Sequence, residues 1–212
     1  MKLFLDTADV KSVKARLSTG LISGITTNPT LIFKSGRHPQ TVYQELIDLG
    51  IDDISMEVVG DSEEELFKNA MGHVKTYAEK ATIKLPCTID GLKACKRLSA
   101  VNVRTNVTLI FSPAQAILAS LAGATYISPF IGRMDDNSLD GMKLINDIKH
   151  TLTTDTKILA ASIRDPQSVS TAFALGADIC TVPTAVFDRM YDHVLTDKGL
   201  DQFNKDHEAT SN

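Results

Sequence analysis

The strongest constraint on the fold is an alternation that repeats along the whole chain. Short apolar runs of strand type alternate with segments whose apolar residues recur at helical spacing, as at Val42, Leu46 and Leu49. Because parallel strands need a long crossover between them, usually a helix, this alternation favours a parallel sheet. The expected strands are residues 3–5, 21–25, 54–59, 81–86, 101–109, 124–129, 157–162 and 177–181.

Helix signals separate these runs. Residues 62–65 and 112–115 have the serine-to-glutamate or serine-to-glutamine spacing of a capping box. Asp165 precedes a proline and is expected to cap the helix that begins there. An amphipathic helix is expected over residues 138–150. The segments after Asn28 and around Arg133 are expected to be loops.

The end of the chain carries a last helical pattern and a polar tail. Pro183 is expected to start a helix with inward-facing residues at Val186, Phe187, Met190 and Val194. The residues after it are mostly polar. Residues from about 198 to 212 are therefore expected to form a C-terminal helix and tail.

Eight strand–helix units in 212 residues predict a parallel barrel near the short end of the (β/α)8 range. The expected architecture is a single-domain (β/α)8 TIM barrel over residues 1–212, since no linker rich in Gly, Ser or Pro divides the chain. An open doubly wound sheet is the alternative. That fold more often has a Gly-rich first turn, which is missing here.

Charge and composition exclude several classes of function. A net charge of −4 without a basic run argues against nucleic-acid binding. No apolar run has membrane-spanning length, and the start of the chain is too short for a signal peptide. Three widely spaced cysteines suggest reduced thiols in a cytoplasmic protein. The five histidines lack metal-ligand spacing, so no metal is expected.

Polar residues stand at or near the end of every expected strand. In a parallel barrel these ends meet at one rim, where catalysis takes place. Each residue alone has a structural explanation, such as a helix cap or an ion pair. Together they place an amine, carboxylates, amides and hydroxyls around one rim: Asp6, Asn28, Glu57, Lys84, Asn106, Thr108, Ser128, Ser162, Arg164 and Thr181.

Lys84 is the candidate nucleophile because it lies within the apolar run Ile83–Pro86. An ammonium group there is costly unless it is paired or deprotonated. A neutral amine attacks carbonyl carbon, so a Schiff base is the natural chemistry. The alternative is an edge-strand lysine whose end reaches water. The surrounding polar strand ends favour a Schiff-base enzyme.

Two arginines suggest the substrate. Arg133 and Arg164 follow late strands, where barrels often bind phosphate. Either arginine alone could equally be a surface residue paired with Asp135 or Asp165. Two at neighbouring strand ends favour a phosphorylated sugar.

Six stretches resemble the small transaldolases, a group that includes the fructose-6-phosphate aldolases. The resemblance follows nearly the whole chain in order. The stretches are Leu3–Ala8, Thr26–Thr30, Ile83–Pro86, Thr105–Ser112, Ser128–Arg133 and Ala160–Arg164.

This resemblance implies a class I aldolase mechanism without metal or organic cofactor. Lys84 would form the Schiff base, Asp6 would take and return the proton of the C4 hydroxyl, and Glu57 with Thr108 would handle a water. The remaining positions would bind the substrate. Asn28, Asn106 and Ser128 match residues for the dihydroxyacetone hydroxyls, Arg133 and Arg164 match the phosphate positions, and Phe130 and Ser162 complete the expected pocket.

Two positions separate the branches of the family. The fructose-6-phosphate aldolases usually carry glutamine and tyrosine where this chain has Glu57 and Phe130. A tyrosine hydroxyl could join the proton relay, whereas Phe130 keeps the pocket apolar. The resemblance therefore implies dihydroxyacetone transfer between sugar phosphates in the pentose phosphate pathway. A fructose-6-phosphate aldolase and a non-catalytic sugar-phosphate-binding barrel remain as alternatives.

The resemblance also implies a homo-oligomer, a decamer or a pentamer, in which a C-terminal helix reaches a neighbouring subunit. The polar tail from Asp201 to Asn212 is the part of the sequence that bears on this expectation. No nucleic-acid or membrane partner is expected.

Overall fold

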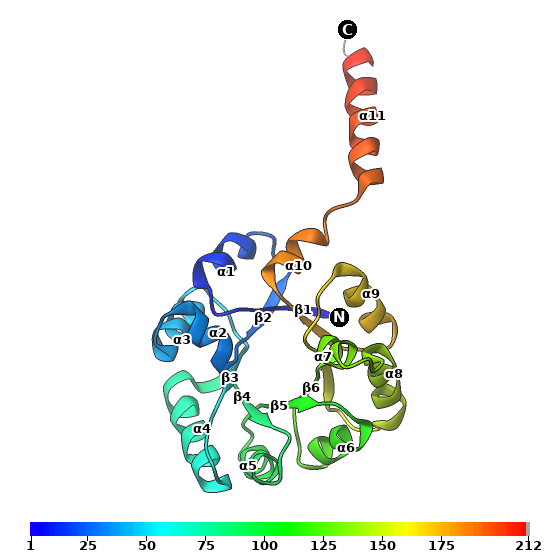
Figure 1. Cartoon of the computed structure of the whole chain (residues 1–212). Coiled ribbons are helices and arrows are strands. Elements are labelled where there is room, and N and C mark those ends of the chain that lie inside the picture. Colours follow the sequence, from blue (N-terminus) through cyan, green and yellow to red (C-terminus); the bar gives the residue numbers. More distant parts are fainter. Residues whose placement is uncertain (211–212) are drawn as a thin grey trace.

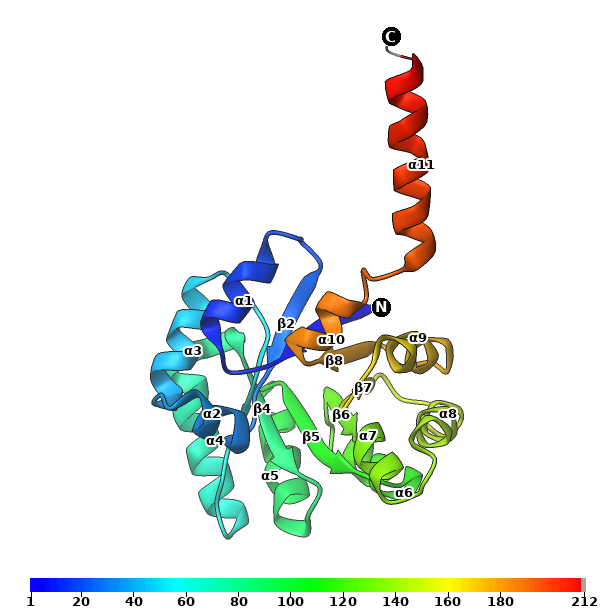
Figure 2. The same ribbon diagram turned by 45° about the horizontal axis from the view of Figure 1, so that its top comes forward.

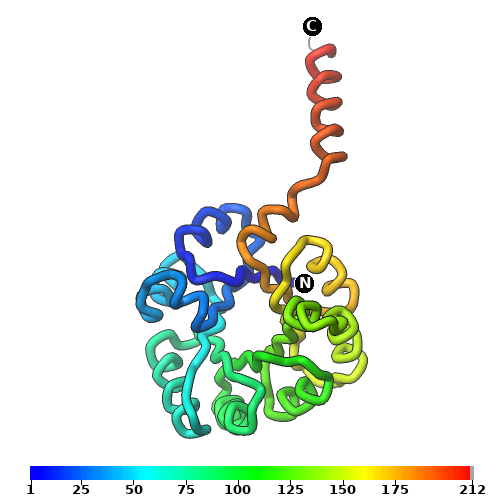
Figure 3. Tube along the Cα trace, viewed as in Figure 1, coloured from blue at the N-terminus to red at the C-terminus, as the bar shows by residue number. Residues whose placement is uncertain are grey.

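A computed structural model describes residues 1–210 of the chain. Its strands close into a parallel barrel in sequence order, with β8 pairing back to β1 (Figures 1 and 3). The predicted (β/α)8 barrel is confirmed, and the doubly wound alternative is wrong. The strands are β1 (Lys2–Asp6), β2 (Ile22–Thr26), β3 (Ile54–Glu57), β4 (Ala81–Pro86), β5 (Thr105–Ile110), β6 (Tyr126–Pro129), β7 (Lys157–Ala160) and β8 (Ile179–Val182).

Helices surround this barrel (Figure 1). Their apolar faces pack on the outer side of the strands and form the larger core. They are α1 (Val10–Leu17), α2 (Pro29–Ser35), α3 (Pro39–Asp48), α4 (Glu63–Tyr77), the 3-10 turn η1 (Ala78–Lys80), α5 (Ile89–Ala100), α6 (Pro113–Leu121), α7 (Ile131–Asp136), α8 (Gly141–Thr151), α9 (Pro166–Ala174) and α10 (Thr184–Arg189). A last helix, α11 (Val194–Thr210), follows them and does not belong to this ring.

The interior of the barrel is layered because side chains alternate along each strand. A smaller apolar cluster includes Phe4, Tyr126 and Ile179, each two residues before a polar strand-end residue. Gly24 makes room for this layer, since a Cβ there would lie only 2.6 Å from Cζ of Phe4. The same alternation that places Phe4 inside therefore also places Asp6 inside, nearer the carboxyl end.

Local sequence signals start several helices as predicted. The hydroxyls of Ser62 and Ser112, in the two predicted capping boxes, accept hydrogen bonds from backbone N–H groups in the first turns of α4 and α6. The Thr88 hydroxyl does the same for α5. Asp165 accepts from the Ser168 N–H at 2.8 Å. Its predicted role as the cap of α9 is confirmed.

Two segments expected to be loops are short helices. Asn28 accepts a hydrogen bond from the Leu31 N–H and caps α2, because its extended backbone leaves the Pro29 turn free to begin a helix. Arg133 lies in α7 instead of a loop. Both helices follow strand ends directly, so they bring their residues to the rim of the barrel.

Two expected element starts were wrong. Strand β5 begins at Thr105, because α5 runs to Ala100 and residues 101–104 lie between the two elements. Helix α8 begins at Gly141, where the side chain of Asp140 accepts from the Lys143 N–H. Ser138 precedes this cap and has a positive φ of 58°. It cannot belong to a right-handed helix.

The C-terminal segment leaves the barrel earlier than expected. Val186 and Phe187 face inward in α10 as predicted, but α10 ends at Arg189. Val194 is 62% exposed, so its predicted inward position is wrong. It begins α11, which starts before residue 198 and projects away from the barrel (Figures 1 and 2). Residues 211 and 212 of the expected tail lie outside the described residues.

Candidate active site

Most of the predicted site residues meet at the carboxyl ends of the strands. A cavity of about 140 Å³, here called the site cavity, is lined by Asp6, Thr26, Asn28, Lys84, Ser128, Phe130, Arg133, Ala161, Ser162 and Thr181. A second hollow of about 390 Å³, here called the outer hollow, shares some of these residues and adds Glu57, Thr108 and Leu109. Lys84 lines both spaces.

Lys84 is buried inside the barrel, with only 4% of its surface exposed. Its position rules out the alternative of a side chain that reaches water. Strands β3 and β4 pair in a register that sets Glu57 beside Lys84. The Lys84 Nζ lies 3.0 Å from Oε2 of Glu57 and donates to the Thr27 carbonyl oxygen at 3.0 Å. The cost of burying the ammonium is thus offset by a carboxylate and a fixed dipole.

Asp6 extends into the site cavity from the last position of β1. Its Oδ1 accepts a hydrogen bond of 2.7 Å from the Thr26 hydroxyl. Burial raises the pKa of Asp6, while the Lys84 charge and the Thr26 hydrogen bond act in the opposite direction. Asp6 can therefore serve as a proton acceptor and donor in the same reaction cycle.

Thr108 has an unusual environment. Its hydroxyl oxygen is buried and has no hydrogen-bond partner among residues 1–210. The pairing of β5 with β6 shifts between Val107 and Ile110, and Leu109 has a positive φ of 59°. This irregularity lies beside the outer hollow, which both Thr108 and Leu109 line. An unpaired hydroxyl next to Lys84 and Glu57 is suited to hold a water or a substrate oxygen.

Asn106 and Ser128 form a connected pair. The Ser128 hydroxyl donates to Oδ1 of Asn106 at 2.7 Å, and Asn106 Nδ2 donates to the Ser55 hydroxyl at 3.1 Å. Asn106 is fully buried and lines neither the site cavity nor the outer hollow. Ser128 lines the site cavity, with Asn106 held behind it.

The two arginines occupy different places. Arg133 lines both spaces, and its guanidinium carbon lies 4.9 Å from the centre of the Phe130 ring. Arg164 is exposed and lines neither space. Both of its terminal nitrogens pair with the carboxylate of Asp136 at the end of α7. The surface ion pair considered for Arg164 is therefore present, with Asp136 as the partner in place of Asp165.

Ser162 reaches the site cavity through a strained loop conformation. It follows β7 with a positive φ of 61°. Its carbonyl oxygen accepts a hydrogen bond from the Gly132 N–H at 3.1 Å. A Cβ at Gly132 would lie 2.1 Å from that oxygen, so only glycine allows α7 to approach the loop so closely.

Three polar groups near the site were not among the predicted site residues. They are the Thr26 hydroxyl, the Thr27 carbonyl and the Ser55 hydroxyl. Thr26 lies two residues after Gly24 on β2, and Ser55 lies two residues before Glu57 on β3. Gly24 and Glu57 are both inward-facing positions. The inward alternation could have found Thr26 and Ser55, once the register of each strand was known.

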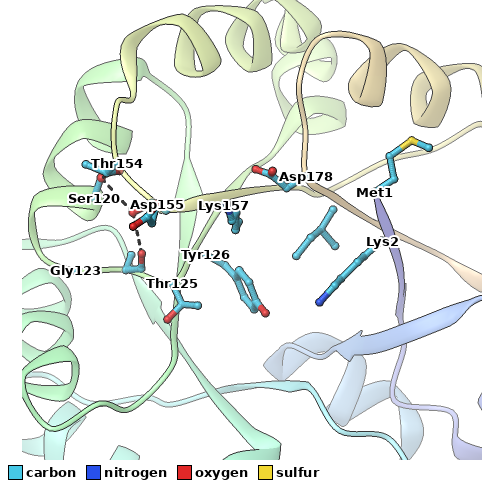
Figure 4. A pocket seen from close by; sticks show the side chains of 13 residues that line it. Met1, Lys2, Ser120, Gly123, Thr125, Tyr126, Thr154, Asp155, Lys157 and Asp178 are labelled. Carbon is cyan, nitrogen blue, oxygen red and sulfur yellow. Dashed lines mark hydrogen bonds between the residues drawn. The ribbon is translucent and has the colours of Figure 1, made fainter.

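Cavity size alone does not mark this site. A larger cavity of about 660 Å³ opens at the amino ends of the strands and holds none of the predicted residues. Figure 4 shows Lys2 and Tyr126 reaching into it from opposite sides. The chemistry of the side chains, and not the volume, distinguishes the carboxyl end.

Within residues 1–210, no three His, Cys, Asp or Glu side chains come together in a way that could hold a metal ion. Across the same residues, none of the helices is both long enough and apolar enough to span a bilayer.

The family model and the relatives found by sequence agree on one family. The model of the Transaldolase/Fructose-6-phosphate aldolase family matches residues 3–212. The chain is 45% identical to a probable transaldolase of Lactiplantibacillus plantarum, over 99% of this chain and 97% of the relative. It is 48% identical to one of Caulobacter vibrioides, over 99% of this chain and 98% of the relative.

A third relative, a probable transaldolase of Paracoccus denitrificans, is 48% identical over 97% of this chain and 96% of its own length. Among solved structures, a thiamine phosphate pyrophosphorylase from Pyrococcus furiosus matches with a TM-score of 0.57 and 17% identity, covering 85% of each chain. At that identity the likeness shows the barrel fold alone.

Proposed function

Since the chain belongs to the transaldolase/fructose-6-phosphate aldolase enzyme family, we propose that it is a transaldolase acting through a Schiff base on Lys84. It transfers a dihydroxyacetone unit from a ketose phosphate to an aldose phosphate. The donors are sedoheptulose 7-phosphate or fructose 6-phosphate, and the acceptors are glyceraldehyde 3-phosphate or erythrose 4-phosphate. These are reactions of the pentose phosphate pathway.

The observation that carries this proposal is the burial of Lys84 beside Glu57, with Asp6 in the same cavity. The amine of Lys84 adds to the C2 carbonyl of the ketose. Loss of water from the adduct then gives an iminium ion. Glu57, 3.0 Å from Nζ, accepts a proton from the amine, and the unpaired Thr108 hydroxyl holds the water that leaves and later returns.

Asp6 drives the cleavage of the carbon chain. It takes the proton of the C4 hydroxyl, the C3–C4 bond breaks, and the aldose phosphate departs. The bond electrons remain on the Lys84 adduct as an enamine. The enamine then attacks the aldehyde carbon of the acceptor, and Asp6 returns its proton to the new hydroxyl. Water finally hydrolyses the iminium ion and restores the Lys84 amine.

The other residues bind the sugar. Asn28 and Ser128 line the site cavity and are assigned to the hydroxyls of the dihydroxyacetone unit, with Asn106 orienting Ser128 from behind. Arg133 and Arg164 are assigned to the phosphate, and Ser162 lines the same cavity as Arg133. Phe130 forms an apolar wall, supported by its edge contact with Phe111 at a centroid distance of 6.1 Å.

Transfer is favoured over release of free dihydroxyacetone because Phe130 offers no hydroxyl to protonate the enamine. The test supplies fructose 6-phosphate with and without erythrose 4-phosphate and measures glyceraldehyde 3-phosphate. We expect rapid formation only when the acceptor is present. Rapid release without an acceptor would identify a fructose-6-phosphate aldolase instead.

A non-catalytic sugar-phosphate-binding barrel is the second alternative. Borohydride reduces an iminium ion to a stable amine, so it should attach the sugar covalently to Lys84 when fructose 6-phosphate is present. Peptide mass mapping locates the adduct. Failure to trap any adduct, with binding intact, would support the non-catalytic alternative.

We also propose a cytoplasmic homo-oligomer, a pentamer or a decamer, assembled through α11. None of the α11 residues described is buried. The exposed residues include the large apolar side chains of Leu195 and Phe203, which are 66% and 70% exposed. An isolated helix of this length gains little stability without packing. Light scattering should show a ring-sized assembly that becomes monomeric when residues 194–212 are removed. Leu195→Ala with Phe203→Ala should act in the same direction.

A further inference from the structure

We propose that Thr26 and Thr181 form a hydroxyl pair that positions the Asp6 carboxylate for proton transfer. The proposal rests on the proposed function, because it assigns Thr26 and Thr181 to the proton-transfer step of that reaction. Neither threonine belongs to the residues assigned above to the sugar or to the Schiff base. Both are positioning residues that act through Asp6.

The two threonines flank Asp6 on the neighbouring strands. Thr26 ends β2 and is paired with Asp6 in the register of β1 and β2. Thr181 lies on β8, on the other side of β1, opposite Phe4. Each threonine is 2% exposed, and each lines the site cavity.

The distances fix the direction of the hydrogen bonds. The Thr26 Oγ1 lies 2.7 Å from Asp6 Oδ1 and 2.7 Å from Thr181 Oγ1. A hydroxyl has one proton, and a carboxylate can only accept. Thr26 therefore donates to Asp6, and Thr181 donates to Thr26. The pair works as a short chain of donors that ends on the base.

This chain holds Asp6 in place and favours its charged form. The charged groups that face the carboxylate are Lys84 on β4, Glu57 on β3 and Arg133 on α7, which lines the same cavity. Burial raises the pKa of Asp6, and the Thr26 hydrogen bond lowers it. Losing that bond must raise the pKa further. Proton removal from the C4 hydroxyl requires ionised Asp6. As the pH is lowered, activity would therefore be lost at a higher pH than in the wild type.

Two other roles are possible for such a pair. The hydroxyls could simply satisfy each other inside the barrel, or they could contact the sugar directly. A structural pair would change stability without moving the pH profile. A sugar-binding pair would change the Michaelis constant for the donor and leave the acidic limb of the profile in place.

The experiment compares Thr26→Val, Thr26→Ser and Thr181→Val in the full-length protein. Valine has the shape of threonine without the hydroxyl, whereas serine keeps the hydroxyl. We expect Thr26→Val to move the acidic limb of the kcat profile up by about one pH unit. Thr181→Val should move it less in the same direction, and Thr26→Ser should leave it at the wild-type position.

Thr82→Val is the matched control. Thr82 is also a fully buried barrel threonine, and its hydroxyl donates to the carboxylate of Asp53 at 2.7 Å, at the opposite end of the barrel. This variant loses the same kind of hydrogen bond far from the site cavity. It should lose thermal stability and keep the wild-type pH profile.

Borohydride trapping separates failure of this inference from failure of the proposed function. Iminium formation on Lys84 does not need Asp6, so Thr26→Val should be trapped with fructose 6-phosphate at the wild-type rate. If the wild-type protein is not trapped at all, the proposed Schiff-base function fails. If the wild type is trapped and Thr26→Val keeps the wild-type acidic limb, or loses trapping as much as turnover, the threonine pair does not act through Asp6.

Discussion

The two ends of the barrel each contain a buried carboxylate with a threonine donor, yet their surroundings differ. At the amino ends, Asp53 accepts from Thr82 and Tyr126, both at 2.7 Å, and pairs with Arg104 at 3.0 Å. At the carboxyl ends, Asp6 accepts from Thr26 beside an open cavity. The carboxylate of Asp53 is surrounded by protein donors, whereas Asp6 faces space for a substrate.

This difference separates stability from chemistry. A buried polar network in which the members satisfy one another fixes the structure. The network at the amino ends includes Tyr126, whose pKa is raised by burial and by the negative charge of Asp53. At the other end, the Thr108 hydroxyl has no partner within residues 1–210, and burial raises the pKa of Asp6. Such incomplete satisfaction is typical of a site that awaits a ligand.

The largest expected effect comes from Lys84→Met at the carboxyl ends. The variant should lose transaldolase activity by at least about 10⁴-fold, because no amine remains to form the Schiff base. The fold should survive, since methionine fills a similar space and Glu57 can reach water through the outer hollow. Activity assays and circular dichroism measure the two properties. If the variant lost its cooperative unfolding transition as well as its activity, this division between the two ends would be contradicted.

At the amino ends the largest effect should fall on stability. Asp53→Ala leaves Arg104, Thr82 and Tyr126 without their shared acceptor, which should lower the free energy of unfolding by about 3–5 kcal/mol. Turnover per folded molecule should stay near the wild-type value. Urea denaturation and active-site titration by borohydride trapping give both numbers.

Asp53→Asn is the control for that change. The amide keeps the size of the side chain and one oxygen acceptor, so the loss of stability should be smaller. A variant that stays stable but loses turnover would mean that the amino ends also serve the chemistry.

Much of the barrel could be predicted because strand and helix periods are local properties of the sequence. The strand ends then followed from topology, the apolar run around Lys84 indicated a Schiff base, and the resemblance implied the roles of Glu57 and Asp6. The inward side of Thr26 was harder to predict, because a shift of one residue would have turned Thr27 inward in its place. The ion-pair partner of Arg164 could not be predicted from the sequence, because tertiary packing alone brings Asp136 beside it.

The missed helices and the early exit of the chain have a related cause. Helices α2 and α7 are short, and such helices depend on packing more than on propensity. The apolar spacing from Val186 to Val194 continues past the end of α10. Nothing local indicates that the chain leaves the barrel at that point. The contacts that decide these features lie far away in the sequence.

Thr108→Val sharpens the comparison at a single hydroxyl. The change should lower kcat by about 10²-fold, because the group that holds the reacting water is lost. Stability should stay the same or rise slightly, since a buried hydroxyl without a partner is removed. Thr82→Val should lower stability and leave kcat near the wild-type value. Thermal denaturation and kcat measurements on both variants test this contrast. It is contradicted if the two variants change stability and kcat in the same way.

The smallest effects should come from the arginines, and they divide in the same way. Arg104 is committed to Asp53 at the amino ends, whereas Arg133 lines the site cavity. Arg133→Ala should raise the Michaelis constant for phosphorylated sugars about tenfold and leave unphosphorylated substrates nearly unchanged. Arg164→Ala should show the same selectivity with a smaller change, because the Asp136 carboxylate already competes for its guanidinium group.

Asp136→Asn completes this test. Without the competing carboxylate, Arg164 should bind the phosphate more readily, and the Michaelis constant for phosphorylated sugars should fall severalfold. Arg164→Ala in the Asp136→Asn background should then cost more than it does in the wild type. If Arg164→Ala weakens phosphorylated and unphosphorylated substrates equally, Arg164 is a structural residue like Arg104, and the phosphate contact belongs to Arg133 alone.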